Sequence, residues 1–240
     1  RIGLLEPTRR AHAGAGLVEL ATLLVAAEID RGEHLFGEPG RFLDDRVEDP
    51  TSAKILAAAY AQLLDFGLRR TTVEDVARRA GVARITVYRR FGGRDELLAT
   101  LLREEAAKVF AEVDAAVATV DGLEQQLTEG FAVLLRSARS HPLLQRLLTT
   151  DADSMIPMLT TGGAFVIALG REYLTSHLDR AVREGRLAIA DVRSAAEVAV
   201  RLTMSFLLTP ESVIPLGSDE DARRFARRHI LPSLNLGGER

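Results

Sequence analysis

Apolar residues recur along this chain at the spacing of an α-helix, and no segment shows the apolar–polar alternation that is typical of a β-strand. The first stripe lies between residues 16 and 31 and consists of Leu17, Leu20, Leu24 and Ala27. The second begins after residue 51 and consists of Ile55, Leu56, Ala59, Leu63 and Leu64. The sequence therefore predicts an all-α fold.

Capping and helix-ending residues mark where the predicted helices begin and end. We expect Thr51 or Ser52 to cap the second helix and Gly67 to end it, because a hydroxyl satisfies free N–H groups and glycine tolerates left-handed backbone. Thr71, with an acidic residue three positions on, predicts a capping box, and Asp95 predicts the cap of a long helix. The helices expected after Gly67 span residues 73–80, 84–91, 96–117, 121–140, 142–150, 163–184, 191–208 and 219–231.

Charge divides the chain into three parts. Residues 1–49 hold 6 basic and 10 acidic side chains, for a net charge of −4. Residues 51–97 hold 9 basic and 5 acidic side chains, net +4, and residues 98–240 hold 16 and 19, net −3. A basic segment between acidic flanks predicts a local anionic partner.

Several functional classes are excluded by what the sequence lacks. Without cysteine, the chain cannot form disulfides, Cys-ligated zinc sites, iron–sulfur clusters or a thiol nucleophile. Its five histidines are scattered without an i, i+4 pair, so we expect no metal site. With no phosphate-binding glycine loop or catalytic motif, we expect no cofactor and no enzyme activity. No uncharged apolar run reaches about 18 residues, so we expect no membrane span and a cytoplasmic protein.

The basic segment contains a helix-turn-helix pattern. Gly81 supplies the positive φ of the turn, and Ala77 and Ala80 are small enough for two steeply crossing helices to touch. The side chains expected beneath them are Val76, Val82, Val87 and Phe91. The face left outside the core carries Arg84, Thr86, Tyr88, Arg89 and Arg90. For Arg78 and Arg79, on the first helix, a solvated face is the better interpretation.

Three stretches, Thr71–Val82, Thr86–Phe91 and Asp95–Leu98, resemble the DNA-binding domain of the TetR family of bacterial transcriptional repressors. The resemblance covers roughly residues 51–105. It implies a three-helix DNA-binding domain followed by a larger helical domain that binds a ligand and forms dimers, here with an extra N-terminal helix. We therefore expect an extension with an acidic linker over 1–50, a DNA-binding domain over 51–97 and a regulatory and dimerisation domain over 98–240.

The resemblance also implies roles for single residues. Arg84 would read guanine, and the methyl groups of Ile85 and Thr86 would meet thymine in the major groove. Tyr88 and Arg94 match phosphate contacts of the family, although a half-buried core position is the alternative for Tyr88. The expected DNA contacts are Thr71, Thr72, Arg84, Ile85, Thr86, Tyr88, Arg89, Arg90 and Arg94.

The partners that the resemblance implies are a palindromic DNA operator and a second copy of the chain. An apolar stripe on the last helix is our candidate for the dimer interface, and burial within one chain is the alternative. Its members are Ala222, Phe225, Ala226 and His229. The helix over 191–208 would complete the bundle, with its polar side chains on one line: Arg193, Glu197, Arg201 and Ser205. A helix-turn-helix protein that compacts DNA without specificity is the rival function.

A small hydrophobic ligand, such as a lipid-derived acid or an apolar drug, is the third implied partner. Either Arg201 or His177 would anchor it, and plain core packing is the alternative for each lining residue. The expected lining is Phe131, Leu135, Met155, Met158, Phe165, Leu169, Tyr173, Met204 and Phe206. Ligand binding would tilt the helix over 96–117, with Gly92 and Gly93 either as a hinge or only as the end of the preceding helix.

Overall fold

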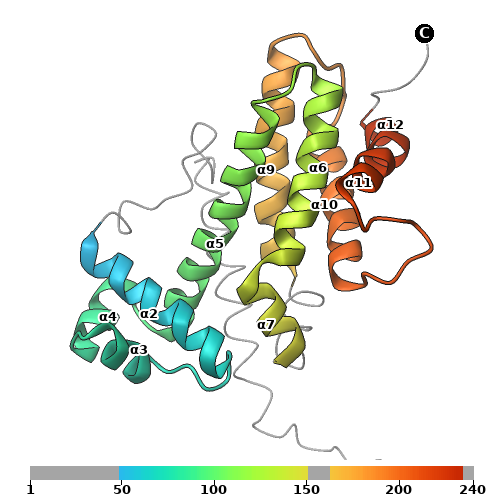
Figure 1. The fold of residues 1–240 in the computed structure, drawn as a ribbon. Helices are drawn as coiled ribbons and strands as arrows, with labels where there is room; N and C mark the ends of the chain where they lie inside the picture. Colours follow the sequence, from blue (N-terminus) through green and yellow to red (C-terminus); the bar gives the residue numbers. More distant parts are fainter. Residues whose placement is uncertain (1–48, 151–162, 235–240) are drawn as a thin grey trace, which may run out of the picture.

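The structure is a computed structural model that describes residues 49–150 and 163–234. Every regular element in these two ranges is a helix, which confirms the all-α prediction (Figure 1). The helix expected over 16–31 lies outside the described residues, as does the stretch 151–162. The elements are α2 (Pro50–Phe66), α3 (Val73–Ala80), α4 (Arg84–Phe91), α5 (Arg94–Val117), α6 (Leu123–Ser140), α7 (Pro142–Thr150), α9 (Ala164–Arg183), α10 (Val192–Leu208), α11 (Asp219–Phe225), the π-helical η1 (Ala226–Ile230) and α12 (Leu231–Ser233).

The first two caps lie one to three residues from where we expect them. Asp49, not Thr51 or Ser52, caps α2, and its Oδ2 accepts hydrogen bonds from the backbone N–H groups of both residues, at 2.8 and 3.0 Å. Pro50 can therefore occupy the first helical position, where its missing N–H costs nothing. Thr72, not Thr71, caps α3 by accepting a hydrogen bond from the Asp75 N–H at 3.1 Å.

Two later helix starts also differ, because glycines take the N-cap positions. Gly93 precedes α5, so Asp95 lies inside the first turn, where its negative charge favours the helix dipole without a capping bond. Gly122 precedes α6, one residue after the expected Asp121. The π-helical turn η1 within the last helix gave no signal in the sequence.

One hydrophobic core joins the helix-turn-helix region to the rest of the chain. Buried residues of α2, α3 and α4 pack with Leu97, Leu98 and Leu101 of α5, and also with Leu143 and Leu147 of α7. Figure 1 shows α7 alongside α2, at the lower end of the molecule. A movement of α7 therefore acts directly on the core beneath α2.

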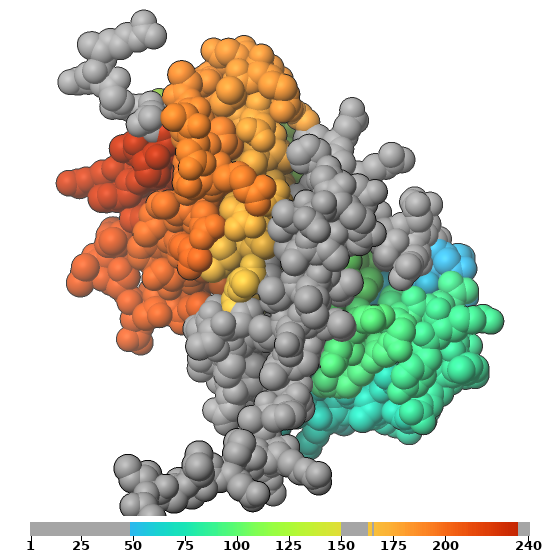
Figure 2. Space-filling model, turned by 180° about the vertical axis from the view of Figure 1, so that it is seen from behind, coloured from blue at the N-terminus to red at the C-terminus, as the bar shows by residue number. Residues whose placement is uncertain are grey.

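A second core occupies the opposite end, where α6, α9, α10 and the last helices meet (Figure 1). Seen from behind, α10 and the last helices lie at the end of the molecule away from α3 and α4 (Figure 2). Ala222, Phe225 and Ala226 are buried in it, and the Phe225 ring lies 5.6 Å from Phe131 of α6 and 5.0 Å from Phe206 of α10. The prediction that this stripe forms the dimer interface is therefore wrong for these residues, because they are buried within one chain. His229 is exposed.

Within the described ranges, no helix is both long and apolar enough to cross a membrane.

Candidate nucleic-acid interface and ligand pocket

The turn between α3 and α4 has the expected geometry. Gly81 adopts φ 65° and ψ 37°, the left-handed region, and its N–H bonds back to Arg78 O at 3.2 Å. Ala77 and Ala80 are buried where the helices approach, and Val87 of α4 is fully buried. Val82 and Tyr88 pack at the edge of this core, half-buried. One face of α4 is thereby fixed inward and the opposite face outward.

The outward face of α4 combines apolar and cationic groups. Ile85 is 73% exposed, and Arg84 and Arg89 are exposed beside it. Arg84 donates a hydrogen bond to the Tyr88 hydroxyl at 3.1 Å, and its Nε lies 2.8 Å from a carboxylate oxygen of Glu74 on α3. The hydrogen bond to Tyr88 and the charge of Glu74 raise the pKa of Arg84. Thr86 is half-buried on the same helix.

Two expected DNA contacts have structural partners within the chain. The Thr71 side chain is buried, and its hydroxyl donates to Gly67 O at 2.7 Å. Arg94 donates to Leu68 O at 2.6 Å and to Thr71 O at 2.8 Å, which fixes the loop between α2 and α3. These bonds were not foreseeable, because sequence spacing gives no information on which carbonyls a long side chain reaches.

Thr72 and Arg90 are also occupied, though nearer the surface. The Thr72 hydroxyl donates to Asp75 Oδ2 at 2.6 Å, and this bond lowers the pKa of Asp75. Arg90 Nη1 lies 2.9 Å from Asp49 Oδ2 and 3.3 Å from the Ser52 hydroxyl, so it ties α4 to the start of α2. Any phosphate that binds Arg90 has to compete with Asp49.

We expect Arg94→Gln to lower the free energy of unfolding by about 1–2 kcal/mol, because two charge-assisted bonds to partly buried loop carbonyls are lost. Urea denaturation measures this. The salt dependence of DNA binding should stay unchanged. If the slope of the logarithm of the binding constant against the logarithm of the salt concentration is smaller by about one unit in Arg94→Gln than in the wild type, Arg94 is a phosphate contact.

A cavity of about 560 Å³ lies among α5, α6, α7, α9 and α10. Five of the expected lining residues do line it, namely Phe131, Leu169, Tyr173, His177 and Met204. This volume is in the range of small-molecule pockets. The lining is mostly apolar, with polar side chains at a few positions, as a site for a hydrophobic ligand requires.

Other expected lining residues are placed elsewhere. Leu135 is buried in the second core, and Phe206 packs on Phe225 outside the cavity. Arg201 is exposed and pairs with Glu197 at 2.8 Å, so it cannot anchor a ligand in this cavity. Met155 and Met158 lie outside the described residues, as does the side chain of Phe165.

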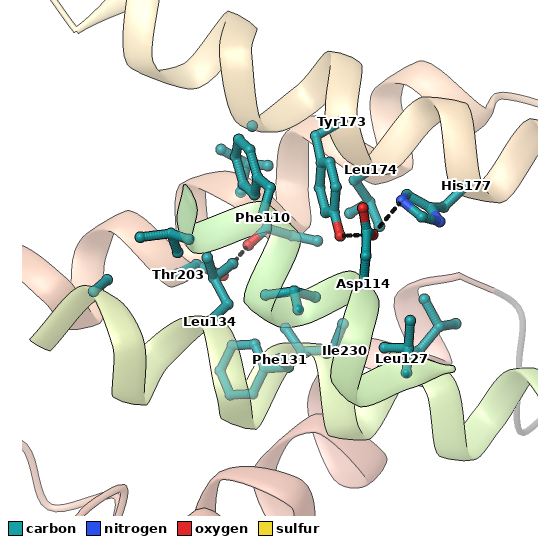
Figure 3. A pocket seen from close by; sticks show the side chains of 18 of the residues that line it. Phe110, Asp114, Leu127, Phe131, Leu134, Tyr173, Leu174, His177, Thr203 and Ile230 are labelled. Atoms are coloured by element: carbon teal, nitrogen blue, oxygen red, sulfur yellow. Dashed lines mark hydrogen bonds and ion pairs between the residues drawn. The ribbon is translucent and has the colours of Figure 1, made fainter. Parts of the chain in front are cut away.

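Asp114 is the central polar residue of the cavity, and we did not predict it. The Tyr173 hydroxyl donates to its Oδ1 at 2.6 Å, and His177 Nε2 lies 3.2 Å from the same atom (Figure 3). Although burial alone would raise it, the pKa of the Asp114 carboxyl is lowered by the adjacent His177 imidazole and by the hydrogen bond from Tyr173. Burial and the bond to Asp114 raise the pKa of Tyr173. The signal in the sequence was an acidic residue on the apolar face of α5, one turn after Phe110.

The helix α7 has two apolar faces with different environments. Leu143 and Leu147 are buried in the core beneath α2, and Leu144 lines the cavity. Leu148 lines the cavity and also packs against the edge of that core. Arg146 Nε donates to Leu64 O at the carboxyl end of α2, at 2.9 Å. The same short helix thus contacts both the cavity and the helix-turn-helix region.

Within the parts of the chain that the structure describes, no three His, Asp or Glu side chains are grouped closely enough to hold a metal ion.

Known protein families match both halves of the chain. Residues 55–101 match the model for bacterial regulatory proteins of the tetR family, and residues 122–227 match the model for the bacterial tetracyclin repressor C-terminal domain. AlkX, an HTH-type transcriptional regulator of Mycobacterium tuberculosis, is 27% identical over 188 residues, which cover 77% of this chain and 85% of AlkX. Rv2250c, an HTH-type transcriptional regulator of the same organism, is 27% identical over 171 residues, which cover 71% of this chain and 86% of Rv2250c.

Two solved structures have a similar fold. One is AlkX from Dietzia sp., a TetR family repressor implicated in biodegradation of n-alkanes, with a TM-score of 0.58 and 24% identity, covering 78% of this chain and 96% of that one. The other is QsdR, a TetR family repressor from R. erythropolis, with a TM-score of 0.57 and 23% identity, covering 80% of this chain and 98% of that one.

Proposed function

The chain belongs to the TetR family of bacterial transcriptional regulators, and on this premise we propose that it is a repressor that a hydrophobic small molecule releases from a palindromic operator. As a member of the family it is a DNA-binding transcriptional regulator and not an enzyme. The observation that carries the proposal is the outward face of α4, where Ile85 stands 73% exposed between cationic side chains.

That face suits the major groove. An isoleucine so exposed gains nothing in the free protein, but its methyl groups match the methyl group of thymine. Arg84 is held by Glu74 and Tyr88 with its guanidinium on the surface, where it can read guanine O6 and N7 in bidentate fashion. Arg89, exposed on the same helix, supplies a cation for the phosphate backbone.

We expect Arg84→Ala to weaken binding to the cognate operator by roughly 10- to 100-fold and to relax the preference at one base pair. The operator comes from genomic footprinting of the bound protein, and fluorescence anisotropy on labelled duplexes at fixed salt gives the affinities. Because Arg84 is on the surface, its loss should leave the fold intact.

The matched control is Arg224→Ala, which removes an exposed, ion-paired arginine from α11 and should leave operator affinity unchanged. An equal loss on cognate and random duplexes for Arg84→Ala would show that Arg84 contacts only phosphate. A wild-type protein without any preference for its footprinted sites would instead favour the DNA-compacting function.

For the dimer, we propose the outward face of α10 as the contact between copies. Val198 on this face is 47% exposed, and it is flanked by Glu197 and Arg201, which pair with each other. A two-fold axis through such a face lets the Arg201 of each copy approach the Glu197 of the other. The buried stripe of α11 contributes indirectly, by supporting α10.

Release from DNA requires the ligand to alter the spacing of two α4 helices, which half-sites one turn apart hold at roughly 34–36 Å. We propose that α7 transmits this change alongside α5, because α7 touches both the cavity and α2.

Gly92 ends α4 with φ 74°, so alanine there strains the backbone whether or not a hinge exists. Gly93 has extended φ, and the space that an alanine Cβ would occupy there is open. Gly93→Ala therefore tests the hinge by restricting the backbone without adding strain or a clash.

A further inference from the structure

The two ends of the cavity differ in chemistry. Along α5 the lining runs from Ala106 to Ala118, a length of roughly 18 Å at the rise of an α-helix. The end next to α7 is apolar, and it is formed by Leu144, Leu148, Val166 and Leu208. The end next to the turn between α5 and α6 is polar, and it contains Gln126, Arg180 and Arg186. A molecule that fills the cavity therefore needs one polar end and a long apolar body.

The cations at the polar end are not equivalent. Arg186 pairs with Glu184 at 2.5 Å and donates to Gln126 Oε1 at 3.3 Å. Arg180 lines the same end, half-buried, and within residues 49–150 and 163–234 its guanidinium has no hydrogen-bond or ion-pair partner. A half-buried guanidinium without a partner loses part of its hydration, and no hydrogen bond or ion pair compensates for that loss. Binding of an anion that pairs with the guanidinium is therefore strongly favoured.

Asp114 does not supply that partner. Tyr173 and His177 already occupy its Oδ1, and Arg180 influences it only through longer-range charge. Figure 3 shows Tyr173 and His177 of α9 both directed at Asp114, which leaves the carboxylate engaged within the wall of the cavity. Among the charged side chains that the structure describes in the lining, Arg186 is paired with Glu184, and Asp114 contacts Tyr173 and His177. Arg180 is left to interact with a ligand, so the cavity favours an anionic ligand over a cationic one.

We infer that the cavity binds an amphipathic carboxylate, with its head group on Arg180 and its apolar chain directed along α5 toward α7. The guanidinium fork matches a carboxylate in bidentate geometry, and the apolar lining buries the chain. The inference rests on the proposed function, since it specifies the ligand of the same cavity. It assigns the recognition of the head group to Arg180, in place of the Arg201 or His177 expected from the sequence.

The test compares three probes that share one chain and differ in head group: dodecanoate, 1-dodecanol and dodecylamine. Isothermal titration calorimetry on the full chain, below the aggregation limit of each probe, measures binding directly. We expect dodecanoate to bind about 10- to 100-fold more tightly than 1-dodecanol, and dodecylamine to bind most weakly. Arg180→Gln should remove the advantage of dodecanoate and leave 1-dodecanol unchanged.

Two variants serve as controls. Arg183→Gln removes an exposed arginine one turn further along α9, outside the cavity, and should bind dodecanoate like the wild type. Arg180→Lys keeps the charge without the fork and should bind dodecanoate with intermediate affinity. Circular dichroism confirms that each variant is folded.

The outcomes separate this inference from the proposed function. The carboxylate inference is overturned if dodecanoate and 1-dodecanol bind with equal affinity, or if Arg180→Gln leaves the affinity for dodecanoate unchanged. In either case, binding of 1-dodecanol would still support the cavity as the site of a hydrophobic ligand. If none of the three probes binds, both the inference and the hydrophobic ligand of the proposed function are wrong.

Discussion

Phe225→Ala is expected to lower the free energy of unfolding by about 3–5 kcal/mol, because it empties the centre of the second core. The ring is 7% exposed and contacts Phe131, Phe206 and His229, at centroid distances of 5.6, 5.0 and 4.9 Å. Urea denaturation at several protein concentrations measures the loss. Because the residue is buried in its own chain, the loss should persist at every concentration.

Val198→Glu is the counterpart that separates folding from assembly. It places a charge on the exposed face of α10, so the chain should remain folded while the sedimentation coefficient falls to that of a monomer. If Phe225→Ala instead yields a stable monomer, or Val198→Glu remains a dimer, the contact between copies involves α11 and not α10.

Leu147→Ala is expected to cost about 2–5 kcal/mol of stability and also to weaken the coupling between ligand and operator. Leu147 is 2% exposed and joins α7 to the core beneath α2. A cavity at this position loosens the contact through which α7 acts on the helix-turn-helix region. Operator affinity measured with and without saturating dodecanoate gives the coupling factor, which is the ratio of the two affinities.

The matched control is Leu178→Ala, the same substitution at a fully buried position in the other core. It should cost a similar stability and leave the coupling factor unchanged. Equal coupling in the two variants would exclude α7 as the transmitting element and favour tilting of α5. If dodecanoate does not bind the wild type, the comparison is made with 1-dodecanol.

Helix positions could be predicted well because apolar spacing and glycines are local signals. Gly81 fixed the turn between α3 and α4, and α9 ends just before Gly185, which has φ 70°, close to the expected end at residue 184. The N-cap residues were harder to predict, because several neighbouring residues have side chains that can cap the same helix. Asp49 precedes a proline and so takes the position expected for Thr51 or Ser52, and Thr72 takes that of Thr71.

The residues of the candidate sites were harder to predict, because long side chains bond to groups that are distant in sequence. Arg94 bonds to carbonyls 23 and 26 residues away, and Arg201 turns outward to Glu197. Apolar lining such as Leu169 and Met204 was expected from the resemblance, which implied a ligand pocket among the middle helices. Asp114 was marked only by its place on the apolar face of α5. Arg180 was not marked at all, since a single charged residue on a helix gives no indication of whether it faces solvent or a cavity.

Because α7 packs against both the cavity and the core beneath α2, a ligand can occupy the cavity without releasing the operator. The polar end of the cavity lies far from this helix, so a ligand that reaches only Arg180 would bind without touching Leu144 or Leu148. Such a molecule would be an antagonist, which competes with the natural ligand and leaves the operator bound. A longer homologue with the same head group would press on α7 and act as an inducer, so chain length and not affinity would set the transcriptional response.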